Sequence, residues 1–380
     1  MMDADLSQLS DGIYFGFPED EYHLIPRLSA SGIKILGASP LQFWLQSWMN
    51  PNRQPDKDTP AKKLGRCYHS LILEGDEAFQ ASYAVAPARA DYPDALDSND
   101  ELKAACDSLG LKKNGTKAEM TARLRDADPG LQFWSDVVSD FTEANAGREF
   151  LSKDQWEEIQ QVRFVLNHMP DIKSAFTGGF PEVTILYHEG AIPMKTRMDY
   201  LKARGKMAAI LDLKSFGNIM SKPIETICED EIGRNGYFIQ PITYNAARSA
   251  VRDLWKKHGA AIVHVVDGPE PSAEWLASVL EPAKAQFHFV FARTGGIPDM
   301  VACEFSEGET FGKQGFMAHE YWRKGVTLYR NGVNRYRDCM QKYGADVPWI
   351  INYGIRKLRD EDFKPWALEY EADLPEEAAA

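Results

Sequence analysis

Two carboxylates and a lysine in the middle of the chain have the residue types and the spacing of a centre that acts on phosphate. Asp212 and Lys214 follow the apolar run MAAIL, and Asp199 lies upstream in the run TRMDYL. Side chains of a strand alternate between its two faces, so Asp212 and Lys214 are expected to point the same way while the leucines beside them point into the core. A hairpin turn at residues 203–206 would bring Asp199 alongside Asp212.

Such a group of side chains suits metal-assisted cleavage of a phosphodiester. Hard oxygen ligands hold Mg²⁺, for which Mn²⁺ is expected to substitute, and the bound metal polarises the phosphate and activates water. Lys214 would orient the water or offset the developing phosphate charge, and Glu182 in the run PEVTI could supply a further acid. The alternative interpretation is a solvent-facing edge hairpin with ordinary surface ion pairs.

The acid-x-Lys triplet is a weak signal by itself, because it occurs four times in the chain. The copy at Asp212 differs from the others in following an apolar run of strand type one hairpin downstream of another isolated acid. This context, rather than the triplet, favours metal-assisted phosphodiester cleavage over a surface ion pair. The other copies are Glu101-Lys103, Asp171-Lys173 and Asp362-Lys364.

These side chains must be positioned by a sheet and by the helices that cover it. The runs PEVTILYHEG, PMKTRMDYLK and KMAAILDLKSF have strand character, and AAIVHVVD, FHFVFART and DMVACEF supply further strands. Upstream, Ser29 or Ser31 caps the first of two short helices, and AKKLGRCYHSLILEG forms a mostly buried helix containing His69. A long amphipathic helix is predicted from about Glu309 to Lys342.

Residues 101–126 form a compact unit of helix, glycine-bearing loop and helix. Leu102, Cys106 and Leu109 share one helical stripe, and residues of the second helix recur at helical spacing. The stretch carries six basic and four acidic residues, a local reversal of the net charge of −13 of the whole chain. Its lysines either contact phosphates or are merely solvated.

Composition indicates an ordinary globular protein expected to be cytoplasmic. The five cysteines are scattered without a CxxC pair, which argues against a zinc site, an iron–sulfur cluster or a disulfide framework. No apolar run is long enough for a membrane helix, and the first residues are acidic rather than those of a signal peptide. The acidic balance is compatible with binding to nucleic acid if basic residues cluster where the strand runs.

The ordered series LGRCYH, PEVTI, TRMDYL, ILDLKSF and IQPITY resembles the PD-(D/E)XK nuclease superfamily, and more closely the exodeoxyribonuclease VIII (RecE) type of phage and prophage exonuclease. The resemblance covers residues 22–300, with 84–150 as an insertion. It implies an α/β restriction-endonuclease-like core with a mixed central sheet flanked by helices and a small helical insert. Its parts are an N-terminal helical part (22–83), the insert (98–128), the nuclease core (150–370) and a disordered tail (371–380).

The resemblance also implies a role for each matching residue. Asp199 and Asp212 become metal-binding acids, Lys214 the catalytic lysine and Glu182 an auxiliary acid. His69 matches the metal-proximal histidine of RecB-like nucleases, although a histidine between Tyr68 and Leu71 also suits a hydrogen-bonded core position. The catalytic set is completed by a Gln-x-x-x-Tyr motif, Gln240 and Tyr244, which share a helix face only if Pro241 lies in the first turn.

The inserted helix pair resembles a SAP motif, the small helix-loop-helix module of DNA-binding proteins, with Leu102, Leu109, Gly110, Leu111, Gly115, Lys117, Met120 and Leu124 as the matching residues. Its helix N-terminus and basic side chains would grip phosphates without reading sequence. The residues expected to contact DNA are Lys103, Lys112, Lys113, Lys117 and Arg123.

Together these resemblances predict a Mg²⁺-dependent exonuclease that degrades linear double-stranded DNA 5′ to 3′ and leaves a single strand for an annealing protein. A homo-oligomer enclosing the DNA is typical of the family. Two alternatives stay open: a structure-specific or single-strand nuclease of the same fold, and a non-catalytic DNA-binding protein that uses the insert. A structural role in a virion has no positive feature in the sequence.

Overall fold

A seven-stranded mixed sheet lies at the centre of the computed structural model, which describes residues 5–54, 59–217, 222–294, 298–310, 316–355, 357–359 and 362. Its strand order is β7-β1-β4-β5-β6-β8-β9; β7 joins β1 and β8 joins β6 in parallel, and the other neighbours are antiparallel. The strands are β1 (Gly12–Phe15), β4 (Gly179–Glu189), β5 (Ile192–Arg204), β6 (Met207–Phe216), β7 (Val263–Val265), β8 (Ala285–Arg293) and β9 (Met300–Glu304).

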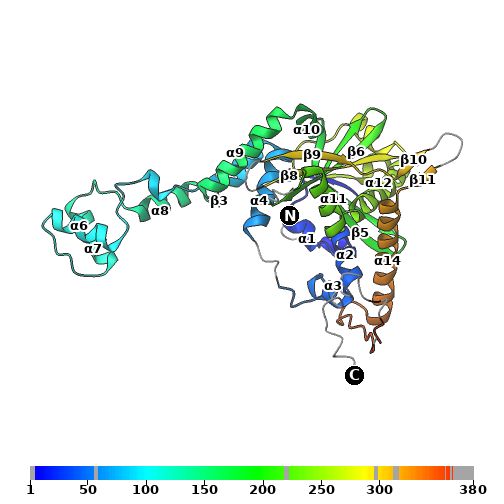
Figure 1. Ribbon diagram of the computed structural model, residues 1–380, viewed down its shortest axis with the longest axis horizontal. Coiled ribbons are helices and arrows are strands. Elements are labelled where there is room, and N and C mark those ends of the chain that lie inside the picture. Colours follow the sequence, from blue (N-terminus) through cyan, green and yellow to red (C-terminus); the bar gives the residue numbers. More distant parts are fainter. Residues whose placement is uncertain are drawn as a thin grey trace, which may run out of the picture.

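Helices cover both faces of this sheet, which confirms the predicted α/β class with a mixed sheet flanked by helices (Figure 1). On one face, apolar side chains of β4, β5 and β8 pack against α2 (Ala30–Ala38), α3 (Pro40–Gln46), α12 (Ile239–His258), α13 (Ala273–Leu280) and α14 (Glu320–Tyr343). On the other face, Tyr200, Leu211 and Leu213 pack against α4 (Pro60–His69), the π-helical segment η2 (Ser70–Glu74), α5 (Asp76–Ser82), α9 (Lys153–His168) and α10 (Pro170–Ala175).

The short helices start where the sequence signals predicted. Ser29 is the N-cap of α2 and accepts a hydrogen bond from the amide of Gly32, while Ser39 and Pro40 begin α3. Smaller elements complete the core. They are η1 (Leu6–Gln8), α1 (Glu19–Leu24), α11 (Ile224–Asn235), η4 (Gly259–Ile262), β10 (Gly308–Thr310) and β11 (Phe316–Ala318).

One prediction about the chain ends needs correction, and one strand was not predicted. The helix expected from Glu309 begins only at Glu320, because residues 308–310 pair with 316–318 as a β-ribbon. The N-terminal strand β1 was missed: it is four residues long and has no alternating pattern, yet it lies inside the sheet between β7 and β4. The expected disordered tail, residues 371–380, lies outside the described residues.

Residues 86–148 form an arm that projects from the sheet domain (Figure 1). The arm leaves after β2 (Tyr83–Val85) and returns at β3 (Glu149–Leu151), and these two strands pair in parallel at its base. Its far end carries α6 (Asn99–Ser108) and α7 (Lys117–Ala127), and α8 (Trp134–Ala144) lies along it. The short helix η3 (Arg89–Asp91) precedes α6 in the chain. Both α6 and α7 begin with a capping box.

The helix pair at the end of the arm has a hydrophobic core of its own, made of Leu102, Cys106, Met120, Leu124 and Phe133. We therefore expect Leu124→Ala to unfold this unit without lowering the Tm of the sheet domain. Removal of a fully buried leucine costs about 2–5 kcal/mol, and a unit this small has little stability beyond that.

Differential scanning calorimetry would resolve this as loss of a low-temperature transition while the main transition stays in place. Leu109→Ala is the matched control, because Leu109 lies in the same unit but is 42% exposed. A single transition that shifts as a whole in Leu124→Ala would contradict independent folding of the unit.

Candidate active site

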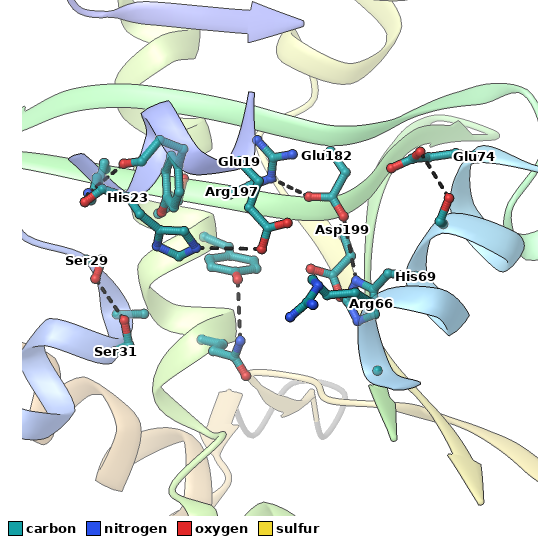
Figure 2. Close-up of a pocket in the computed structure, with 18 of the residues that line it drawn as sticks. Glu19, His23, Ser29, Ser31, Arg66, His69, Glu74, Glu182, Arg197 and Asp199 are labelled. Atoms are coloured by element: carbon teal, nitrogen blue, oxygen red, sulfur yellow. Dashed lines mark hydrogen bonds and ion pairs between the residues drawn. The ribbon is translucent and has the colours of Figure 1, made fainter. Parts of the chain in front are cut away.

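A pocket of about 490 Å³ opens between α1, α2, α4, the strands β4 and β5, and the first turn of α12 (Figure 2). Its walls include His69, Glu182, Asp199, Gln240 and Tyr244. These residues were all proposed from the sequence, and they come from four elements spread over 176 positions of the chain. The pocket is therefore assembled by the tertiary fold around the predicted residues.

Glu182 lies at an interruption of the β4–β5 ladder. Pro181 pairs with Tyr200 and Val183 pairs with Met198, but the intervening positions, Glu182 and Asp199, are not paired. Glu182 has φ +52°, a left-handed conformation that no other non-glycine residue in the described part of the chain adopts. Such a conformation costs about 1–3 kcal/mol, so the surrounding structure must hold it in place.

The interruption changes which face the strand side chains occupy. Phe180 and Val183 lie three positions apart yet pack on the same hydrophobic cluster, whereas regular alternation would put them on opposite faces. Leu201 and Met198 of the neighbouring strand show the same spacing. The break lets two carboxylates from adjacent strands project toward one pocket.

Asp199 is held at the junction of β5 and β6. Tyr200 pairs with Leu211, so the next positions in this register are Asp199 and Asp212. Beyond Tyr200 and Leu211 a side chain takes over from the backbone pairing: Asp199 Oδ2 accepts a hydrogen bond from the amide of Leu213 at 2.7 Å. The side chain is 12% exposed. The structure thus places the two aspartates side by side, as the hairpin through Gly205 predicts.

Asp212 is fully buried and its two oxygens face different partners. Lys214 forms an ion pair with Oδ2, which agrees with the alternation that puts both side chains on one face of β6. Gln240 donates from Nε2 to Oδ1 at 3.1 Å. The ammonium of Lys214 also lies 5.2 Å from the centre of the Tyr237 ring. Asp212 is therefore the anchor for a lysine and an amide at the edge of the pocket.

Two of the other acid-x-Lys copies lie on helices, which separates them from the copy on β6. Glu101 and Lys103 belong to α6, and Asp171 and Lys173 to α10. Residues two apart on a helix point to different faces, so these pairs cannot converge on one ligand. For the copy at Asp362, Lys364 lies outside the described residues.

His69 reaches the carboxylates from the last turn of α4, where the helix continues as the π-helical segment η2. Its Nδ1 lies 3.6 Å from Glu182 Oε1, and its Nε2 lies 4.0 Å from Asp199 Oδ2. One ligand atom from each of His69, Glu182 and Asp199 lies within 4.8 Å of the other two. Figure 2 shows the three side chains converging. The histidine thus faces the acids and not the apolar core.

Gln240 and Tyr244 share one face of α12, because Pro241 falls in the first turn. The helix begins at Ile239, where the amide that proline lacks would have no partner inside the helix. Gln240 Nε2 lies 3.4 Å from the hydroxyl of Tyr244 and donates to Asp212 as well. The pair therefore connects the pocket wall to the buried acid.

Arg197, to which the sequence assigned no role, also lines this pocket. Its Nε pairs with Glu182 Oε2, and its Nη1 donates to the carbonyl of Phe17 at 2.6 Å. Two residues of α1 also line the pocket, Glu19 and His23, whose Oε1 and Nε2 atoms lie 3.6 Å apart. The only sequence signal for Arg197 was its position two residues before Asp199.

Lys195 was also missed, and it holds α1 against the pocket. It is buried, and its ammonium donates to the carbonyls of Tyr22 at 2.8 Å, Ile25 at 2.9 Å and His23 at 3.2 Å. Burial lowers the pKa of Lys195 to about 7. Its role is to satisfy the last carbonyl groups of a six-residue helix.

The charges in the pocket are strongly coupled. Burial, reinforced by the charge of Asp212, raises the pKa of Asp199 to about 7. Burial alone would lower the pKa of His69, but the carboxylates of Asp199 and Glu182 outweigh it and raise that pKa to about 9. For Glu182, burial is outweighed by His69 and Arg197, which lower the pKa of its carboxyl group. The positive charges of His69 and Arg197 thus compensate the carboxylates here, and a divalent cation would take the place of the proton on His69.

The donor set fits a divalent cation. Two carboxylate oxygens suit Mg²⁺ or Mn²⁺, and the imidazole nitrogen is better tolerated by Mn²⁺ than by Mg²⁺. The raised pKa of Asp199 supports the fit, since two adjacent buried carboxylates are both ionised only when a positive charge lies beside them. In the metal-free protein, protonated His69 supplies that charge.

Metal binding is consequently expected to release protons near pH 7. Ligation needs a neutral imidazole and an ionised carboxylate, whereas the pKa of about 9 for His69 and of about 7 for Asp199 keep protons on both groups. The apparent affinity for Mn²⁺ should therefore rise as the pH increases from about 6 to about 9. Isothermal titration calorimetry in buffers of different ionisation enthalpy measures the release.

The His69→Gln variant should release fewer protons, because its amide has none to lose in this range. Binding of Mn²⁺ with unchanged affinity across the range and without proton release would argue against these ligands.

The basic residues expected to contact DNA lie on the arm, apart from the pocket (Figure 1). Several of them form ion pairs on the surface: Lys103 with Asp100, Lys113 with Asp107 and Lys117 with Asp97. Arg123 donates to the carbonyls of Lys112 and Asn114 in the loop between α6 and α7. Lys112 and Lys113 thus lie in this loop, Lys117 and Arg123 on α7, and Lys103 on α6.

Comparison with protein families shows that the chain carries a SAP domain, matched over residues 98–129. This confirms the SAP assignment made from the sequence. Comparison with curated protein sequences gave no significant match. None of the described helices has the length and apolar composition needed to cross a membrane.

Among solved structures, the chain is similar to a protein from Eubacterium rectale that is named provisionally as an exonuclease. The TM-score is 0.41 with 14% identity, and the alignment covers 85% of this chain and 84% of the other. A TM-score this low does not establish a common fold.

Proposed function

We propose that this protein is a metal-dependent deoxyribonuclease. The observation that carries the proposal is the convergence of His69, Glu182 and Asp199, with ligand atoms within 4.8 Å of one another, beside the buried Asp212–Lys214 pair. The SAP domain supports DNA as the polymer, because it adds a module of DNA-binding proteins to the same chain. The resemblance to PD-(D/E)XK nucleases points the same way.

His69, Glu182 and Asp199 would hold a divalent cation, Mg²⁺ or Mn²⁺, with Asp212 beside them. When bound, such a cation polarises a phosphate and makes water a better nucleophile at neutral pH. Arg197 keeps Glu182 ionised and oriented for this role. The strained backbone of Glu182 is consistent with a position selected for its chemistry.

Lys214 would act as a fixed positive charge. Burial alone would lower the pKa of its ammonium, but Asp212 and Asp199 outweigh that effect and raise it. The group therefore keeps its proton and offsets phosphate charge electrostatically, instead of serving as a base. Asp212 orients it, while Gln240 fixes the second oxygen of Asp212.

Tyr244 would serve as a neutral hydrogen-bond donor. Burial raises the pKa of its hydroxyl well above the ordinary value, so the proton stays in place. Through Gln240 it is linked to Asp212. A hydroxyl in this position can donate to a phosphate oxygen of a strand that lies in the pocket.

In its finer form, the proposal is an exonuclease that degrades linear duplex DNA 5′ to 3′ for phage-type recombination, working with a single-strand annealing protein and with a homo-oligomer as its active form. This form rests on the resemblance found in the sequence. The arm supports it, since a SAP domain outside the pocket could hold duplex DNA while one strand is cut.

The test compares end-labelled linear duplex, circular duplex and linear single strands, each with Mg²⁺, Mn²⁺ or EDTA. Metal-dependent loss of linear duplex alone, with mononucleotide release from the 5′ end, supports a 5′ to 3′ duplex exonuclease. Cleavage of single strands or of circular DNA supports a nuclease but refutes an exonuclease specific for linear duplex DNA. If the protein binds DNA under every condition but never cleaves it, the proposed nuclease activity is refuted and the protein is a non-catalytic DNA-binding protein.

A further inference from the structure

A second pocket, of about 770 Å³, lies between α2, the beginning of α12 and α14. Its rim carries Lys34, Arg335 and Lys342, with Asp338 as the single acid among its lining residues. Arg335 is fixed there, because its Nη1 also donates to the carbonyl of Gly37 at 3.0 Å. The rim is thus basic in a chain whose net charge is −13.

Two helices, α2 and α12, contribute residues both to this basic pocket and to the candidate active site. The start of α2 lines the active-site pocket through Ser29 and Ser31, and its next turns line the basic pocket from Ile33 onward. At the beginning of α12, Gln240 faces the first pocket and the preceding residue, Ile239, faces the second. The two pockets are therefore neighbours in space.

A pair of lysines bridges them around one aromatic ring. Lys214 lies 5.2 Å and Lys34 lies 5.9 Å from the centre of the Tyr237 ring. Burial is the larger cause that lowers the pKa of Lys34, and the positive charge of Lys214 lowers it further. Asp212 compensates the charge of Lys214, and a phosphate that approaches the Tyr237 ring would be attracted by both ammonium groups.

The helix that forms the far wall is basic as a whole. α14 carries six basic and two acidic residues, which fall on two flanks of its buried stripe. Lys324, Arg335 and Lys342 lie on the flank that faces α2 and the beginning of α12. Arg323, Arg330 and Arg337, at seven-residue spacing, lie on the other flank.

Between its basic rims the pocket is largely apolar. Ile33, Ile239 and Leu328 line it, and Tyr343 adds an aromatic ring beside Lys342. A basic rim beside an aromatic ring and apolar side chains suits single-stranded nucleic acid, because a base can stack on the ring while phosphates contact the rim. A duplex buries its bases and would not use these side chains.

We propose that this groove holds one DNA strand as it passes to or from Lys214, with Lys34, Arg335 and Lys342 contacting its phosphates. The inference rests on the proposed function and adds the path of the strand. It identifies the ligand as a single strand and places its backbone between α2 and α14.

The test measures binding of a labelled oligothymidylate of about 20 nucleotides by fluorescence anisotropy over a range of salt concentrations, in EDTA so that the strand stays intact. Arg335→Gln/Lys342→Gln should weaken binding about tenfold and reduce the slope of log K against log salt by about 1.4, since each lost phosphate contact is worth about 0.7. The matched control is Arg330→Gln/Arg337→Gln, which removes the same charge from the other flank of α14 and should change neither quantity.

Because Arg335 also contacts α2, Lys342→Gln alone is measured as well and should reduce the slope by about 0.7. Equal effects of the groove variant and its control would overturn the inference, as would weakening confined to a duplex probe. Cleavage is assayed on the same preparations. If the wild-type protein cuts no DNA but binds the strand through the groove, the proposed nuclease activity is refuted and the proposed strand-binding groove still stands.

Discussion

Asp212→Asn is expected to reduce cleavage of DNA by at least about 10³-fold, the largest effect of any single substitution proposed for this chain. The isosteric amide keeps the packing of a fully buried position, but it removes the charge that pairs with Lys214. It also removes a negative charge beside the carboxylates that would hold the cation. Initial rates on labelled duplex at saturating Mg²⁺ measure the loss.

Asp171→Asn is the matched control, because Asp171 belongs to another acid-x-Lys triplet but lies exposed on α10. It should cleave at the wild-type rate. Circular dichroism and Tm of both variants separate a chemical effect from unfolding, since loss of a buried charge pair can also destabilise the protein. Wild-type activity in a folded Asp212→Asn variant would refute the proposed centre.

Replacing residues 88–147 by a short Gly/Ser linker is expected to have the second largest effect, on binding of duplex DNA and not on chemistry. The arm is closed at its base by the β2–β3 pair, so the sheet domain should stay folded without it. Non-specific contacts to phosphates are electrostatic. We therefore expect affinity for duplex DNA to fall by about 10- to 100-fold at moderate salt, while hydrolysis of short strands is retained.

A full-length variant separates charge from the mere presence of the arm. Neutralising Lys103, Lys112, Lys113, Lys117 and Arg123 to glutamine leaves the buried residues of the helix pair in place. If each of these side chains contacts one phosphate, the salt slope falls by up to about 4.5. Unchanged duplex affinity in both variants would show that the SAP domain is not used for DNA.

The sequence alone predicted the features that depend on residue spacing within one strand or one helix pair. The face shared by Asp212 and Lys214 follows from strand alternation, and the capping boxes of α6 and α7 mark their helices directly. The SAP assignment rests on apolar and glycine spacing within about 30 residues, which a helix pair with its own core preserves. In each case the spacing within one element determines the geometry.

Other features depended on contacts between distant elements. The left-handed backbone of Glu182 and its ion pair with Arg197 occur where the pairing of β4 with β5 is interrupted. The run PEVTI contains no residue type that predicts this interruption. β1 enters the sheet because its neighbours offer hydrogen bonds on both sides, although four residues are too few for a pattern.

The basic groove is the clearest case of what only tertiary structure decided. Lys34 and Lys342 are separated by 308 positions, and each looks in the sequence like an ordinary surface lysine. They line one pocket because α14 packs against α2 through Gly332, where a Cβ would lie 2.3 Å from Ile33. Periodicity determines which residues share a face of a helix, but the packing of one helix on another determines which faces meet.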